Sequence, residues 1–167
     1  MPVRAVVATV MCTSLILSGG AAVAHNQAFS DPDDSIRPAD LKRVAMSHDG
    51  GRYTFKATTW DNFSNRSMGP SRGVSWELDT MDAVGEFDFD HQVVLNWMRH
   101  NGRRQYRCRV YRHSTGGFVG NFPGSRNDRT VKCPNIPDSK WGNRDIYTWN
   151  VLSLHEGSFD SAGPYEH

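Results

Sequence analysis

Alternation of apolar and polar residues along the chain is the feature that most restricts its fold. Apolar side chains occupy every second position within residues 53–58, 74–79 and 87–97. Successive side chains of a strand point to opposite faces, so this pattern is typical of strands with one buried face. Helical spacing is confined to a possible single turn near residues 137–141. The sequence therefore predicts an all-β protein.

Turn-forming dipeptides separate the predicted strands. Asp49-Gly50 and Asn101-Gly102 both suit the positive φ angles of tight hairpins. About eight short strands divided by such turns predict an antiparallel β-sandwich, jelly-roll-like or immunoglobulin-like. Further strands are predicted near residues 41–47, 104–112, 117–122, 128–133 and 146–154.

The N-terminal segment has the pattern of a secretory signal peptide. A basic residue, Arg4, precedes an apolar run, and Ala22-Val23-Ala24 fits the small-x-small rule for cleavage, which predicts a signal peptide over residues 1–24. Residues 25–40 lack periodicity and are predicted to be a flexible leader to one domain at 41–167. No later segment is apolar over a membrane-spanning length. A secreted protein of the extracellular space or cell envelope is expected.

Two cysteines remain after the predicted cleavage. Cys12 lies within the signal segment, whereas Cys108 and Cys133 lie on the apolar faces of their predicted strands. An even number of cysteines in an exported chain favours a disulfide. Neither residue has the spacing of a zinc ligand pair. We therefore predict a bridge between Cys108 and Cys133 inside the sandwich.

Charge and motif content exclude several functional classes. The chain has 19 Lys and Arg against 18 Asp and Glu, so no overall excess favours nucleic acid as a partner. The string Gly69-Pro70-Ser71-Arg72-Gly73 matches a hydrolase nucleophile motif, but a polar loop precedes it and a predicted strand follows. No metal-hydrolase, phosphate-loop or dinucleotide motif is present. The sequence predicts no catalytic residue.

An acidic segment between two predicted strands is a candidate calcium site. Its candidate ligands are Asp79, Asp82 and Asp88. Oxygen ligands that converge in a loop are what Ca²⁺ requires. The alternative is a solvated hairpin tip whose charges discourage pairing between sheet edges.

A basic segment surrounds the Asn101-Gly102 turn. Arg103, Arg104 and Arg107 are its candidate ligand-binding residues. Clustered arginines with interleaved tyrosines suit phosphate, sulfated glycan or another anionic polymer. The alternative is that these arginines pair with acidic residues of the neighbouring strand.

Two tryptophans fall in predicted loops or strand ends. Trp60 precedes Asp61-Asn62, and Trp141 lies among Pro, Gly and Asn residues. Exposed aromatic faces beside amides suit stacking on sugars. The alternative is that both rings anchor loops to the fold.

The chain resembles a group of small exported β-sandwich proteins of actinobacterial type, most of them uncharacterised. The resemblance covers about residues 40–165 and implies a sandwich without known catalysis. It rests on Asp40-Leu41-Lys42-Arg43-Val44, His48-Asp49-Gly50-Gly51-Arg52, Leu78-Asp79-Thr80, Phe87-Asp88-Phe89 and Asp160-Ser161-Ala162-Gly163-Pro164.

Together these features predict a secreted, non-catalytic β-sandwich that binds a cell-surface glycan or an anionic polymer. Two alternatives remain open at this point. One is an extracellular hydrolase, which would require converging catalytic groups in a cleft. The other is a protein-interaction or inhibitor module, which would present a protruding rigid loop.

Overall fold

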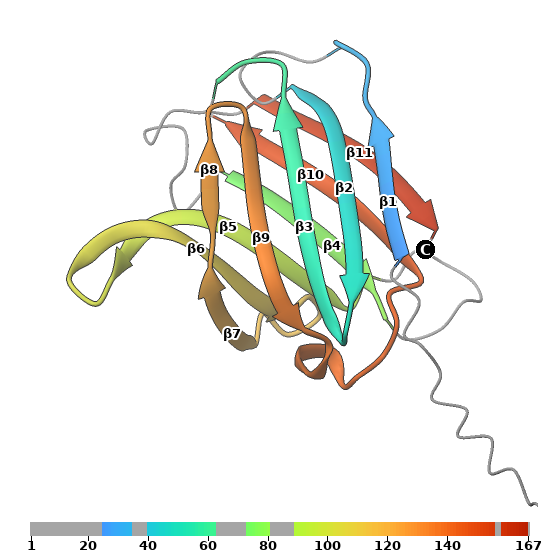
Figure 1. Ribbon diagram of the computed structural model, residues 1–167, viewed down its shortest axis with the longest axis vertical. Coiled ribbons are helices and arrows are strands. Elements are labelled where there is room, and N and C mark those ends of the chain that lie inside the picture. Colours follow the sequence, from blue (N-terminus) through green and yellow to red (C-terminus); the bar gives the residue numbers. More distant parts are fainter. Residues whose placement is uncertain (1–24, 35–39, 63–72, 81–88, 156–157, 167) are drawn as a thin grey trace, which may run out of the picture.

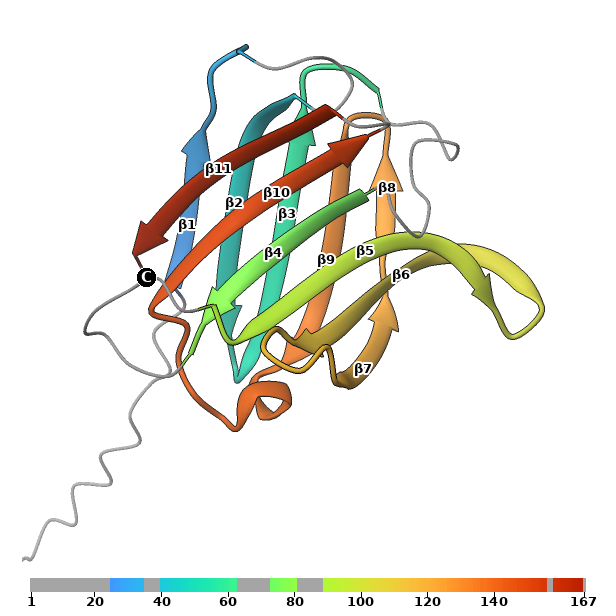
Figure 2. The ribbon, with the colours of Figure 1, turned by 180° about the vertical axis from the view of Figure 1, so that it is seen from behind.

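Two antiparallel sheets of five and six strands pack face to face, and their strands cross at an angle (Figures 1 and 2). The sandwich predicted from the alternation is confirmed. The computed structural model describes residues 25–34, 40–62, 73–80, 89–155 and 158–166.

The first sheet has the strand order β1-β2-β3-β9-β8. Every neighbouring pair in it is antiparallel. Its strands are β1 (His25–Ser30), β2 (Leu41–Asp49), β3 (Arg52–Thr59), β8 (Ser125–Asn127) and β9 (Thr130–Pro137).

The second sheet has the strand order β11-β10-β4-β5-β6-β7, again antiparallel throughout. A 3₁₀ turn, η2 (Asp138–Trp141), follows β9 at the predicted position. The described residues include no helix of the length and apolarity that crossing a membrane requires. The strands are β4 (Gly73–Asp79), β5 (His91–His100), β6 (Arg103–Arg112), β7 (Phe118–Pro123), β10 (Thr148–His155) and β11 (Ser158–Glu166).

The inward faces of the two sheets form the core. Tyr53 and Phe55 of β3 meet Trp76 of β4 and Trp149 of β10, and all four side chains are fully buried. Burying a large apolar side chain contributes about 2–3 kcal/mol relative to leaving it exposed. On β3 the buried positions alternate with exposed or half-buried ones such as Lys56, which is the pattern read from the sequence.

Part of the segment predicted as a flexible leader is instead a strand. Residues 25–30 form β1, which pairs with β2 at the sheet edge. Phe29 stacks on Tyr165 with ring centroids 3.9 Å apart, and the Gln27 side-chain carbonyl accepts a 3.1 Å hydrogen bond from the Trp149 indole. A short edge strand with one large apolar residue carries no visible periodicity, which explains the wrong prediction.

The described residues form eleven strands where about eight were predicted for the chain. Besides β1, the strands β8 and β11 were not predicted. β8 has three residues, and the edge strand β11 is rich in polar residues and contains Pro164. Proline is tolerated on sheet edges because an edge strand leaves some backbone N–H groups unpaired. In addition, β5 begins at His91 and not at residue 87.

The Cys108–Cys133 disulfide is present, as predicted, with a Cα–Cα distance of 5.7 Å. It joins β6 of one sheet to β9 of the other. The chain crosses between the sheets beside the bridge at Gly124, where an added Cβ would lie 2.9 Å from the Cys108 sulfur. The disulfide therefore fixes the sheets together at the end from which β5 and β6 extend.

We expect the double substitution Cys108→Ser and Cys133→Ser to lower the free energy of unfolding by about 3 kcal/mol, because the bridge closes a 25-residue separation. Denaturant unfolding of both proteins measures this change. Mass spectrometry of the unreduced wild type should give one linked peptide pair, and free thiols at both positions would contradict the structure.

Candidate functional site

Strands β5 and β6 extend past the other strands as a two-stranded ribbon. The described part of β4 pairs with β5 no further than Leu95, and β7 pairs with β6 no further than Arg107. Among the described residues, 97–106 therefore form strand pairs only with one another, and one backbone contact leaves the range, a 3.0 Å hydrogen bond from Gly124 to the Tyr106 carbonyl. Figure 1 shows this ribbon curving away from the sandwich beyond β8. We call residues 97–106 the β5–β6 ribbon.

The turn at the end of the ribbon has the predicted geometry. Asn101 has φ 50° and Gly102 has φ 78°, the two positive values that a two-residue hairpin of matching twist requires. A tight turn keeps the strands paired to their last residues. The side chains at the tip are therefore held on an ordered backbone.

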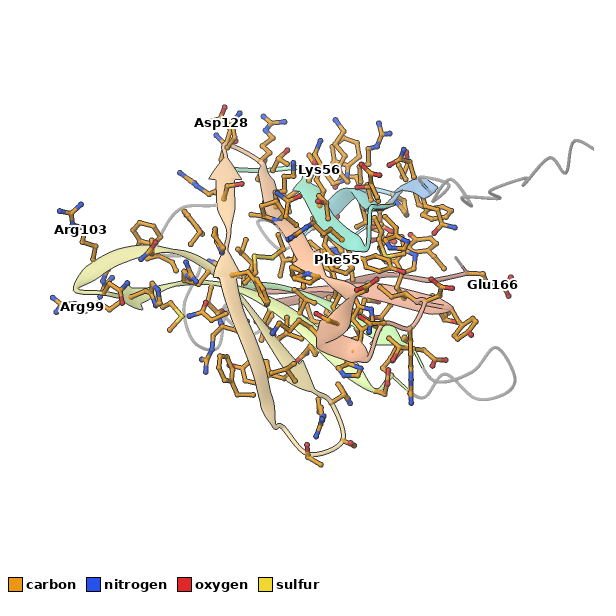
Figure 3. The ribbon with its side chains drawn as sticks, turned by 60° about the horizontal axis from the view of Figure 1, so that its bottom comes forward. Phe55, Lys56, Arg99, Arg103, Asp128 and Glu166 are labelled. Carbon is orange, nitrogen blue, oxygen red and sulfur yellow. A yellow bond between two sulfur atoms is a disulfide. The ribbon has the colours of Figure 1, made fainter. Side chains whose placement is uncertain are left out.

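Two pairs of basic residues lie near the tip, one pair on each face of the ribbon. Arg99 lies directly opposite Arg104, and His100 lies directly opposite Arg103. The three arginines are exposed, and Figure 3 shows Arg99 and Arg103 at the end farthest from the core. Like charges directly across a sheet destabilise it, so this arrangement contributes nothing favourable to folding on its own.

The tip arginines show no ion pair with the acidic residues that the structure describes on the neighbouring strand. No ion pair in the described part of the chain involves Arg99, Arg103 or Arg104. Glu77 of the neighbouring β4 lies opposite Gln92, and its carboxylate contacts His113 at 3.4 Å. Among the described residues, charge pairing across strands is therefore not seen at the tip.

Aromatic side chains line the base of the ribbon. The rings of Trp97 and Tyr106 are 4.7 Å apart, and the guanidinium carbon of Arg126 on β8 lies 6.0 Å from the Tyr106 ring. Burial raises the pKa of Tyr106, so its hydroxyl stays protonated at neutral pH. The aromatic residues therefore connect the positively charged tip of the ribbon to the core.

Arg107 belongs to the base of the ribbon. Its Nε donates a 2.8 Å hydrogen bond to the Asn121 side chain, and a terminal nitrogen donates one of 3.0 Å to the Asn121 carbonyl. Both contacts fix the guanidinium against β7. Arg103 and Arg104 lie at the exposed end, so the structure places the three predicted arginines in two different environments.

The two predicted tryptophans do not lie together at this site. Trp141 is 3% exposed and its ring lies 5.2 Å from that of Tyr53, so the prediction of a sugar-stacking loop residue is wrong there. The turn η2 folds the residue into the core. Trp60 follows β3 in the other sheet, with the Lys42 ammonium 4.4 Å from its ring.

The predicted calcium ligands are only partly described. Asp79 ends β4 and is 7% exposed, opposite Thr148 of β10. Asp82 and Asp88 lie outside the described residues. The calcium site at this segment stays a prediction.

A different set of carboxylates converges where β1, β2 and β11 meet. Oxygens of Asp31, Asp34, Asp40 and Asp160 all lie within 4.8 Å of one another. Asp160 accepts a 2.6 Å hydrogen bond from the backbone N–H of Leu41. The acidic residues within 31–34 are visible in the sequence. Asp160 lies 119 residues after Leu41, however, so the cluster was not predicted. Oxygen sets of this kind are compatible with Ca²⁺ or with shared protons.

Burial, followed by the charges of Asp160, Asp34 and Asp40, raises the pKa of Asp31 to about 7. The folded protein therefore holds a proton near pH 4–7 that the unfolded chain releases. The stabilisation is complete below the unfolded pKa and is lost as pH rises through about 7.

We expect Asp31→Asn to flatten this pH dependence and to be more stable than wild type by about 1 kcal/mol at pH 8, a value discounted for the carboxyl's partial exposure. Thermal unfolding across pH 4–8 with a chelator present measures the effect. Asp128→Asn, in the exposed β8–β9 turn, is the matched control. An unchanged pH slope in Asp31→Asn would contradict this account.

A hydrogen-bonded Asp–His pair lies at the start of β5. The Asp90 carboxylate lies 3.0 Å from Nδ1 of His91 and accepts hydrogen bonds from the backbone and hydroxyl of Thr80 at 2.9 and 2.7 Å. Burial acts to raise the pKa of Asp90, but the hydrogen bonds from His91 and Thr80 outweigh it and hold the pKa below its ordinary value. The pair adjoins a pocket of about 530 Å³ that Ser114 and Ser139 also line.

Comparisons with known proteins add no family assignment. No protein-family model, curated protein or solved structure matches the chain significantly.

Proposed function

We propose that this protein is a secreted, non-catalytic binding protein whose β5–β6 ribbon holds an anionic polymer such as an acidic cell-surface glycan. The ribbon projects from a sandwich held by a disulfide between the sheets. Disulfides persist in oxidising compartments outside the cytosol. The N-terminal signal pattern supports the same location.

The observation that carries the proposal is the opposition of Arg99 to Arg104 and of His100 to Arg103. The like charges of Arg99 and Arg104 repel each other, and none of the three arginines has an acidic partner among the described residues. A polyanion along the ribbon would replace repulsion with attraction, and guanidinium groups bind carboxylate, sulfate and phosphate in a bidentate manner. The whole chain has a net charge of only +1, so attraction of a polyanion would come from the ribbon and not from the overall charge.

The hydrolase alternative has one favouring observation. Nδ1 of His91 faces Asp90 at 3.0 Å, which is how an acidic residue orients a catalytic base. Two serines line the adjoining pocket. Turnover of an ester substrate that His91→Ala abolishes would favour this alternative. We place it second because the Asp90 carboxylate also serves to bind the Thr80 backbone.

We expect wild type to be retained on a sulfated-polysaccharide resin at low ionic strength and to elute as salt rises, because exposed contacts are screened. Charge reversal with Arg103→Glu and Arg104→Glu should weaken binding by about tenfold or more, since each ligand contact there becomes repulsive. The melting temperature should not fall, because Arg99 then faces an acid.

The matched control reverses Lys56 and Lys132, an exposed like-charged pair opposite each other on β3 and β9. Lys56 lies on another face of the molecule from the ribbon (Figure 3). This variant should elute like wild type. An equal loss of retention in both variants, or no retention of wild type at low salt, would overturn the assignment of polymer binding to the ribbon.

A further inference from the structure

Apolar side chains lie on the outward face of the six-stranded sheet, where a sandwich ordinarily presents polar ones. Phe118, Leu154 and Phe159 are 57%, 39% and 56% exposed. Leu154 and Phe159 lie directly opposite each other on β10 and β11, and Phe118 lies opposite Tyr111 on β6. This grouping distinguishes the face from an ordinary solvated sheet surface.

A groove of about 450 Å³ crosses this face from β11 to β6. Figure 2 shows β11, β10, β4, β5 and β6 side by side on the side of the sandwich turned to the viewer. At about 4.8 Å between strands the groove runs for roughly 19 Å. Gly73 and Ser75 of β4 leave the middle of the groove open, because neither residue has a large side chain. We call this the outer groove.

Arg109 supplies a positive charge at one end of the outer groove. Its guanidinium carbon lies 4.9 Å from the Tyr111 ring and 5.4 Å from the Phe118 ring, so the side chain lies along the sheet. No ion pair in the described part of the chain involves Arg109. A guanidinium set between aromatic rings and without a carboxylate is complementary to an anionic group.

Amide side chains complete the lining. Gln92 and Asn96 of β5 reach the groove, and each amide carries donors and an acceptor. Such groups fix the orientation of a ligand that has hydroxyl groups. A purely apolar ligand such as a lipid chain would cover the Gln92 amide and the Arg109 guanidinium without hydrogen-bonding to them, which is unfavourable.

From this lining we infer that the outer groove binds a short acidic oligosaccharide, with sugar rings against Phe159 and Leu154 and a carboxylate on Arg109. A sugar ring has C–H faces for apolar contact and hydroxyls for the amide of Gln92. A protein partner typically needs about 800 Å² on each side, more than a groove of this size offers. The inference concerns a surface separate from the ribbon and does not depend on polymer binding there.

The test is isothermal titration of the full secreted chain with a short oligogalacturonate and with a neutral malto-oligosaccharide of equal length. The acidic sugar should bind at least about tenfold more tightly than the neutral one, because only the former pairs with Arg109. Arg109→Gln and Phe159→Ala should each weaken acidic-sugar binding by about tenfold or more. Both side chains face outward, so thermal melting should show folded variants.

Two matched controls should bind as wild type does. Tyr147→Ala removes an exposed aromatic ring outside the groove, and Lys132→Gln removes an exposed cation on the other sheet. The ribbon variant Arg103→Glu, Arg104→Glu should also keep its affinity for the short sugar. A loss of affinity for the short sugar in that variant would assign sugar binding to the ribbon and overturn the inference.

Other outcomes would also overturn it. These are no heat with the acidic sugar at millimolar concentration, equal affinity for the neutral sugar, or unchanged affinity in Arg109→Gln. Self-association of wild type that Phe159→Ala abolishes would assign the face to a second copy of the chain. Binding of phospholipid vesicles that Phe159→Ala abolishes would assign it to a lipid surface.

Discussion

The structure depends on apolar packing between two sheets that overlap over only part of their length. The rings of Tyr53, Phe55, Trp76 and Trp149 fill the space where the sheets face each other. The Cys108–Cys133 bridge fixes β6 to β9 at one end of this overlap. Beyond the bridge, β5 and β6 extend past the opposite sheet, whose strand β8 contacts only the base of the ribbon among the described residues, through Arg126 beside Tyr106. The β5–β6 ribbon is therefore a consequence of unequal sheet dimensions together with the tight Asn101-Gly102 turn.

The two proposed binding surfaces follow from the same geometry. The ribbon carries charge where the core no longer requires apolar residues, so Arg99 and Arg104 can face each other in solvent. The outer groove lies over the widest part of the six-stranded sheet, between Phe159 on β11 and Arg109 on β6. β5 and β6 contribute to both surfaces. A long acidic polysaccharide could contact the groove and the ribbon together, which would add avidity to two modest interactions.

Local patterns sufficed for the parts of the fold that depend on neighbouring residues. Alternation in β3, β4 and β5, the Asn101-Gly102 turn and the inward faces of Cys108 and Cys133 were all predictable because strand periodicity and turn chemistry are local. The edge strands β1 and β11 were not predictable. Their pairing depends on Phe29, Trp149 and Tyr165 meeting across a long sequence separation.

The sites, too, could be predicted only where their residues lie close together in the sequence. The basic tip could be predicted because its residues surround one hairpin turn. Trp141 was misassigned because its burial against Tyr53 is a tertiary contact. The outer groove combines β4, β5, β6, β10 and β11, and its composition becomes visible only when the strand register is known.

Arg99 and Arg104 are expected to repel each other at the tip of the ribbon and not to stabilise the fold. The thermal stability of Arg104→Gln at low ionic strength tests this most directly. Removal of the charge opposite Arg99 should leave stability unchanged or raise it by about 0.2–1 kcal/mol, and added salt should reduce the difference. A loss of stability of similar size at low salt would mean that Arg104 is held by an attractive contact, and would contradict the account.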